Sequence, residues 1–229
     1  MALGKQRDIP GRENTFGALI LAAGQSRRMN GVDKTFAYIL GKPLILHTLE
    51  VFLSCSHIRK IVLVLSESNI QYGRSLVQEG KIPTEVILCL GGRRRQDSAS
   101  KGLKALGQHD WIVVHDGARP CLSLATLKNT LTKAQCYGNA VAALPVTDTL
   151  KKAGQHCYVS DTISRDSVWS IQTPQVFPYS ILQQAYSKVN LDVTDDSSLV
   201  EALGYRIKLA QGSIDNLKVT SPRDLDIAE

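Results

Sequence analysis

Short runs of Val, Ile and Leu recur along this chain of 229 residues, and longer stretches of helical character separate them. Strands that are apolar on both faces are typical of a parallel sheet with helices on both sides. The alternation of strands and helices therefore predicts an α/β open sheet. The expected strands are Phe16–Ala22, Lys60–Leu65, Glu85–Leu90, Trp111–His115, Ala140–Leu144 and Arg206–Ala210.

Helices are expected between these strands, and several have sequence signals at their ends. Thr194 is the expected N-cap of one helix, and Gly204 ends it. Ser221 followed by Pro222 marks the start of a short terminal helix. The other expected helices are Pro43–Leu53, Asp97–Leu106, Leu124–Cys136, Ser180–Ser187 and, after Thr194, Asp195–Leu203.

A predicted β-hairpin interrupts the alternation, within an arm at about residues 147–170. Two β-prone stretches, Thr149–Ala153 and Cys157–Ile163, are joined by Gly154-Gln155-His156. Such an arm has little core of its own, so we expect it to pack against a second subunit and to form a homodimer. The alternative is a surface hairpin that folds over its own domain.

Composition supports one folded domain. With 43% apolar and 21% charged residues the chain is typical of a globular protein, and its length suits a single domain at residues 16–229 after a flexible leader at 1–15. No apolar run reaches the roughly 18 to 20 residues of a membrane span. The five cysteines are odd in number and include no C-x-x-C pair, which favours reduced thiols in the cytoplasm.

The net charge of +6 indicates an anionic partner. Aromatic residues are only 6% of the chain and no nucleic-acid motif is present, so a nucleic-acid partner is not expected. The basic residues instead form short clusters of a size that suits a phosphorylated small molecule.

The first predicted strand ends in Ala22-Ala23-Gly24, and Arg28 and Lys34 follow. Small residues at the carboxyl end of a strand let the backbone close on a ligand, and the cations are then within reach of its phosphates. This pattern predicts a triphosphate-binding loop, although neither G-x-G-x-x-G nor the Walker motif is present. A tight turn with solvated arginines is the alternative.

A second cluster, Gly91-Gly92-Arg93-Arg94-Arg95, lies between a strand and a helix that Asp97 or Ser98 is expected to cap. Paired glycines expose backbone groups that could bind the edge of a base. A surface turn with three hydrated arginines explains the same residues equally well.

The third cluster is His115-Asp116-Gly117-Ala118-Arg119, where an apolar strand ends in a carboxylate. Ligands of open α/β sheets bind beyond the carboxyl ends of strands, so Asp116 is expected to bind Mg²⁺ together with substrate phosphates. An Asx-turn at the strand end is the alternative for Asp116. His115 is expected to be structural, because satisfied buried polar groups are more common than catalytic ones.

These clusters, in this order, resemble the 2-C-methyl-D-erythritol 4-phosphate cytidylyltransferases of the non-mevalonate isoprenoid pathway. The resemblance runs from Ala18 to the C-terminus, with one local departure: the family usually has Pro-Lys-Gln where this chain has Asp33-Lys34-Thr35. Further shared landmarks are Pro145-Val146-Thr147-Asp148-Thr149-Leu150-Lys151, Arg165 with Trp169, Thr173-Pro174-Gln175-Val176-Phe177, Thr194-Asp195-Asp196 and Asp215-Asn216-Leu217-Lys218-Val219-Thr220.

The resemblance implies a role for each matching position. It implies catalytic roles for Arg28, Lys34, Arg165 and Lys218, with Arg28 and Lys34 stabilising the transition state at the α-phosphate. CTP-binding positions are Ala22, Ala23, Gly24, Gly92, Ser98 and Asp116, of which Gly92 and Ser98 match the cytosine-recognition positions. Positions that match the acceptor-binding set are Arg119, Thr149, Arg165, Thr173 and Lys218.

The resemblance also implies a Rossmann-like, mostly parallel open sheet with helices on both faces, one reversed strand, and a homodimer joined by the hairpin arm. The implied reaction transfers CMP from CTP to a phosphorylated sugar alcohol, 2-C-methyl-D-erythritol 4-phosphate, with Mg²⁺ as cofactor. No protein nucleophile is needed, because a phosphate dianion attacks directly and positioning supplies most of the acceleration. The alternatives are a ribitol 5-phosphate cytidylyltransferase and a non-catalytic nucleotide-binding protein on the same fold.

Overall fold

The computed structural model describes residues 14–24, 34–83, 85–189, 191 and 193–229. Within these residues, seven strands form the main sheet: β1 (Phe16–Ala22), β4 (Ile58–Leu65), β5 (Val86–Leu90), β6 (Trp111–Asp116), β7 (Ala140–Pro145), β10 (Trp169–Pro178) and β11 (Leu209–Gln211). Their order in the sheet is β11-β7-β10-β6-β1-β4-β5. The predicted leader lies almost entirely outside the described residues.

Strand β10 is reversed, since it pairs antiparallel with both β6 and β7 while the remaining pairs are parallel. The predicted Rossmann-like, mostly parallel sheet with one reversed strand is therefore confirmed. Strand β10 was not among the strands expected from the apolar runs. Its middle carries Gln172, Thr173 and Gln175, which are buried polar residues and interrupt the apolar pattern.

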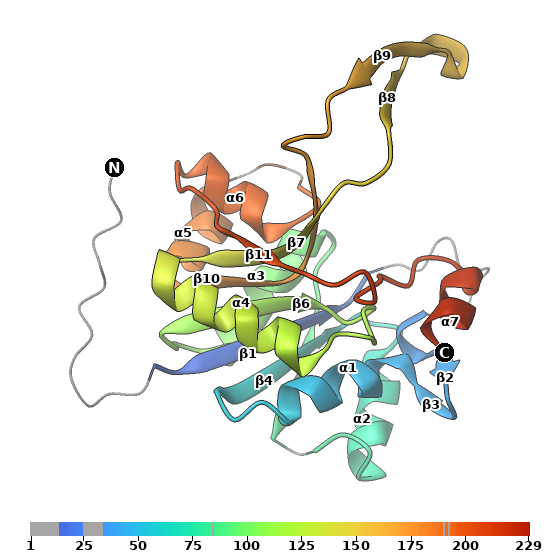
Figure 1. The fold of residues 1–229 in the computed structure, drawn as a ribbon. Coiled ribbons are helices and arrows are strands. Elements are labelled where there is room, and N and C mark those ends of the chain that lie inside the picture. Colours follow the sequence, from blue (N-terminus) through green and yellow to red (C-terminus); the bar gives the residue numbers. More distant parts are fainter. Residues whose placement is uncertain (1–13, 25–33, 84, 190, 192) are drawn as a thin grey trace.

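Helices cover both faces of the sheet (Figure 1). On one face, apolar side chains of β1 such as Ala18 and Ile20 pack with α1 (Leu44–Leu53), α2 (Ile70–Gln78) and α4 (Leu124–Tyr137). On the other face, Leu19 packs with α3 (Arg95–Leu106), α5 (Tyr179–Lys188) and α6 (Asp196–Ala202). Because successive strand residues point to opposite faces, β1 belongs to both cores.

Some predicted boundaries and caps are wrong. Asp195, not Thr194, is the N-cap of α6, and its carboxylate accepts the backbone N–H of Ser198. Helix α3 begins at Arg95 with Arg94 as its N-cap, where Asp97 or Ser98 was expected. The last strand is shorter than predicted, because residues 206–208 lie outside β11. Helix α2 was not predicted, since few apolar residues mark its buried face.

The predicted hairpin is present as β8 (Leu150–Ala153) and β9 (Val159–Ile163), joined by the short helix η2 (Gln155–Cys157). It projects away from the body of the molecule (Figure 1). Tyr158, Val159 and Ile163 of the hairpin are exposed, with Tyr158 76% accessible in the single chain. The chain rejoins the main sheet at the expected end of the arm, where Trp169 and Ser170 of β10 pair with β7.

The remaining elements lie beside the sheet. The short helix η1 (Lys34–Phe36) leads into the two-stranded pair β2 (Tyr38–Ile39) and β3 (Lys42–Pro43). The terminal helix α7 (Pro222–Ala228) has Ser221 as its N-cap, as the sequence predicted, with a capping box between Ser221 and Asp224. No helix in the described ranges has the length and apolar character needed to cross a membrane.

Candidate active site

A cleft of about 920 Å³ opens at the carboxyl edge of the sheet, where β1, β4, β5 and β6 end. This is where an open α/β sheet binds its ligands. The structure brings together here many of the residues selected from the sequence, which come from four separate segments. Those that line the cleft are Ala22, Ala23, Gly24, Gly92, Ser98, Asp116 and Lys218.

One wall of the cleft is the loop between β5 and α3. Gly91 lies so close to β1 that a Cβ atom on it would come within 2.4 Å of the Ala23 Cβ. The backbone N–H of Gly92 donates to Ser98 Oγ at 2.9 Å. The two residues matched to base recognition are therefore bonded to each other and face the same cleft.

Asp116 at the end of β6 is surrounded by cations. Its Oδ2 lies 2.9 Å from Lys218 Nζ and 3.4 Å from Arg119 Nε, and its Oδ1 lies 3.5 Å from Arg95 Nη2. Burial opposes ionisation of this carboxyl, but Lys218, Arg95 and Arg119 outweigh burial and hold the pKa of Asp116 well below its usual range. Asp116 is thus ionised throughout the physiological pH range.

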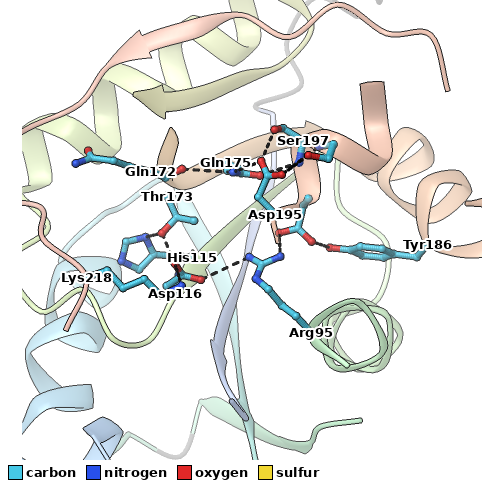
Figure 2. A network of polar contacts seen from close by, with 12 residues as sticks. Arg95, His115, Asp116, Gln172, Thr173, Gln175, Tyr186, Asp195, Ser197 and Lys218 are labelled. Carbon is cyan, nitrogen blue, oxygen red and sulfur yellow. Dashed lines mark hydrogen bonds and ion pairs between the residues drawn. The ribbon is translucent and has the colours of Figure 1, made fainter. Parts of the chain in front are cut away.

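Thr173 of β10 lies next to Asp116 and His115 (Figure 2). Its hydroxyl accepts the backbone N–H of Asp116 at 3.0 Å and lies 2.9 Å from His115 Nδ1. Burial lowers the pKa of His115 to about 3, so the imidazole is neutral at physiological pH. A neutral imidazole agrees with the structural role expected for His115, although its Nε2 is buried with no hydrogen-bond partner among the described residues, so the role stays a prediction.

Sequence reasoning did not identify the partner of Arg95. The Arg95 guanidinium donates to Asp196 at 2.6 Å while its other terminal nitrogen faces Asp116, and Tyr186 donates to the second oxygen of Asp196 at 2.7 Å (Figure 2). Burial opposes the charge on Arg95, but Asp196 and Asp116 together raise its pKa. The Asp195-Asp196 pair was noted as a landmark only, and nothing local connects it to the arginine cluster.

The other predicted site residues lie elsewhere. Arg119 and Thr173 are buried beside Asp116 and do not line the cleft. Thr149 and Arg165 lie on the arm segment, where Arg165 donates to the Thr147 carbonyl, and neither lines the cleft of its own chain. Arg28 lies outside the described residues, and Lys34 begins η1.

Asp116 meets the chemical requirements of a Mg²⁺ ligand, because it is an ionised, hard oxygen donor in the cleft wall. In the described part of the chain, no three His, Cys, Asp or Glu side chains are grouped so that they could hold a metal on their own. A single carboxylate fits Mg²⁺, which is commonly held by one or two carboxylates together with substrate phosphates and water.

Comparison with known proteins gives one consistent result. Residues 16–229 match the family model described as 2-C-methyl-D-erythritol 4-phosphate cytidylyltransferase. Relatives of that name from Dehalococcoides mccartyi and Bacillus velezensis are 46% and 42% identical, over 93% and 92% of this chain and 94% and 93% of their own lengths. A solved 4-diphosphocytidyl-2C-methyl-D-erythritol synthase from Anaerococcus prevotii superposes with a TM-score of 0.82 at 28% identity, covering 94% of each chain.

Proposed function

Since the chain belongs to the 2-C-methyl-D-erythritol 4-phosphate cytidylyltransferase family, we propose that its cleft holds CTP and the acceptor phosphate around Asp116. The protein is a nucleotidyltransferase that transfers CMP from CTP to 2-C-methyl-D-erythritol 4-phosphate in isoprenoid precursor biosynthesis. The observation that carries the site assignment is the meeting of Asp116, Lys218 and Arg119 at the carboxyl edge of the sheet, beside the loop Ala22–Gly24.

In the proposed reaction, an oxygen of the acceptor phosphate attacks the α-phosphorus of CTP in line. The new phosphorus–oxygen bond forms as the bond to the bridging oxygen breaks, and pyrophosphate leaves with that electron pair. Charge grows on the attacked phosphoryl group and on the leaving group, so fixed cations accelerate the step. By the family resemblance, Arg28 and Lys34 serve the α-phosphate, while Gly92 and Ser98 hold the base.

Magnesium is part of the proposal, with Asp116 as its protein ligand. When bound, the ion would neutralise charge on the triphosphate and orient it. Lys218, Arg119 and Arg95 balance the charge of the Asp116 carboxylate. An ionised Asp116 is therefore available to a metal ion at any pH at which CTP carries its full charge.

The acceptor is proposed to bind on the Lys218 and Arg119 side of Asp116. Thr149 and Arg165, which match acceptor-binding positions, lie on the arm segment and not in the cleft of their own chain. This separation supports a homodimer in which each arm serves the neighbouring cleft. The exposed apolar side chains of the arm, Tyr158 and Val159 among them, would be buried by such contact.

A cytoplasmic location is also proposed. All five cysteines are free thiols in the structure, although two of them, Cys136 and Cys157, are exposed. Exposed free thiols persist in a reducing compartment, which supports this location.

The test is an assay of pyrophosphate release from each of the four nucleoside triphosphates, with 2-C-methyl-D-erythritol 4-phosphate or ribitol 5-phosphate as acceptor. Turnover is expected with CTP and the methylerythritol acceptor. Faster turnover with ribitol phosphate would reassign the acceptor. Binding of CTP without release of pyrophosphate in any combination would favour the non-catalytic alternative.

A further inference from the structure

Asn216 lies in the segment between β11 and α7, two residues before Lys218, and is fully buried. Its backbone carbonyl accepts a hydrogen bond from Arg119 Nη1 at 2.7 Å. Its side-chain Nδ2 donates to the Thr173 carbonyl at 2.8 Å and to Gln172 Oε1 at 3.3 Å. One residue thus contacts two of the proposed acceptor-binding residues and precedes a third.

The orientation of this amide is fixed by its surroundings. Gln172 Nε2 donates to the Ser213 carbonyl at 2.9 Å, so Gln172 Oε1 must face Asn216 as an acceptor. A flipped Asn216 would place its own oxygen against two acceptors, the Thr173 carbonyl and Gln172 Oε1. The Asn216 nitrogen therefore has to point toward them, and its Oδ1 has no hydrogen-bond partner among the described residues.

The neighbouring backbone leaves this pair little freedom. A Cβ atom on Gly212 would lie 2.4 Å from Gln172 Oε1 and 3.2 Å from the Ala143 carbonyl, so the Gln172 amide fills the space above the glycine. Gly212 is itself bonded to the Ala143 carbonyl at 2.9 Å. Through Gln172, Asn216 is therefore packed against the tightly filled region around Gly212 and Ala143 of β7.

Arg119, Thr173 and Lys218 reach the site from three different segments: the loop after β6, strand β10, and the segment after β11. These segments are far apart in the sequence, so contacts between the segments must set the spacing of the three side chains. From the contacts of Asn216 we propose that it is a positioning residue, which fixes the separation of these three groups without contacting substrate. The proposal deepens the function proposed above and rests on it, because it assigns Arg119, Thr173 and Lys218 to the acceptor phosphate.

The substitution Asn216→Asp tests this with little change in volume. It replaces the donating NH₂ group by an oxygen that faces two acceptors, so the three groups should shift relative to one another. Small misplacements of reacting groups cost up to about a hundredfold in rate. We therefore expect kcat/KM for the acceptor to fall on the order of tenfold to a hundredfold. The Kd for CTP, measured calorimetrically without acceptor, should change no more than in the control.

The matched control is Asn139→Asp, at the residue that directly precedes β7. Asn139 is also fully buried, donates to the Arg206 carbonyl at 2.9 Å and accepts the Lys208 N–H at 3.0 Å, but it does not line the cleft. It should lose stability in the same way and keep the wild-type kinetics for the acceptor. A second variant, Gln172→Leu, removes one of the two acceptors of Asn216 and should show the same selective loss to a smaller extent.

Equal acceptor kinetics in Asn216→Asp and Asn139→Asp would overturn the proposal, as would a loss of CTP affinity that matches the loss in acceptor kcat/KM. If Asn216→Asp does not fold, Gln172→Leu decides the question by the same comparison. Wild-type protein is measured first, with CTP and 2-C-methyl-D-erythritol 4-phosphate. Its failure to release pyrophosphate would reject the proposed function, and the positioning role with it, before any variant is compared.

Discussion

Gly91 is the point at which one added methyl group should damage CTP binding. In Gly91→Ala the new Cβ would lie 2.4 Å from the Ala23 Cβ and 2.9 Å from Ser98 Oγ. Carbon atoms in contact are normally about 3.5–4.0 Å apart, so the loop and the end of β1 must separate by about 1 Å. That movement displaces Ser98, whose hydroxyl oxygen accepts a hydrogen bond from the Gly92 N–H.

The expected cost follows from these contacts. Overpacking of a tight site typically costs about 1–3 kcal/mol, and loss of the Gly92–Ser98 hydrogen bond adds about 1 kcal/mol. If about 2 kcal/mol of this cost is lost from the free energy of CTP binding, the Kd for CTP rises about thirtyfold. Because the proposed base-binding wall is affected directly, part of this cost should appear as weaker CTP binding as well as in the free energy of unfolding.

The assay is calorimetric titration of CTP into Gly91→Ala, with urea unfolding of the same sample. Gly154→Ala is the control, because a Cβ on this arm glycine meets its nearest atoms at 3.8 Å, an ordinary contact. The control should bind CTP as the wild type does. Wild-type affinity in Gly91→Ala would refute the reasoning, and would show that the Gly91 wall is not where the nucleotide lies.

Chelation with EDTA is expected to abolish pyrophosphate release and Mg²⁺ to restore it; full turnover in excess EDTA would contradict the metal role of Asp116. Replacing Arg28 or Lys34 with Ala should lower kcat on the order of a hundredfold or more with a much smaller rise in KM for CTP, whereas a change confined to KM would limit both residues to substrate binding. From pH 7 to pH 5, wild type should lose about 2 kcal/mol more unfolding free energy than His115→Gln, because the unfolded chain takes up a proton below about pH 6.5 while burial holds the folded pKa at about 3. The contribution of neutral His115 to the unfolding free energy is therefore complete above about pH 6.5 and is lost as the pH falls toward the folded-state pKa of His115. Equal losses of unfolding free energy in urea titrations of the two proteins would exclude this account. If each arm serves the partner's cleft, mixing inactive Arg165→Ala and Lys34→Ala proteins under conditions of subunit exchange should restore roughly a quarter of wild-type activity. A mixture that stays inactive despite proven exchange would show that Arg165 acts within its own chain.

Much of the fold could be predicted because its signals are local. Apolar runs such as Phe16–Ala22 mark strands buried on both faces, and the polar residues that follow them must meet at one edge of a parallel sheet. For this reason Gly24, Gly92 and Asp116, which are far apart in sequence, could be placed in one site before the structure was known.

The features that were missed depend on contacts between distant segments. Strand β10 is in part polar because Gln172, Thr173 and Gln175 bond to side chains and backbone from other elements, and a periodicity argument has no access to those partners. Arg95 and Asp196 are 101 residues apart, and their pairing requires α3 and α6 to pack on the same face of the sheet. A run of three arginines does not show which one turns inward.

The balance of charge around Asp116 bears on how the proposed site would take up its ligands. Arg95, Arg119 and Lys218 face Asp116 and Asp196, so three cations meet two carboxylates and leave one positive charge for an anionic ligand. Arg95 is anchored by Asp196, and the Arg119 side chain is only 10% exposed and bound to Asn216. Lys218 is 38% exposed and is the most accessible of the three cations. If Mg²⁺ neutralises Asp116 as proposed, Lys218 is the cation that would be free to turn to the acceptor phosphate, because Arg95 and Arg119 are held by other partners.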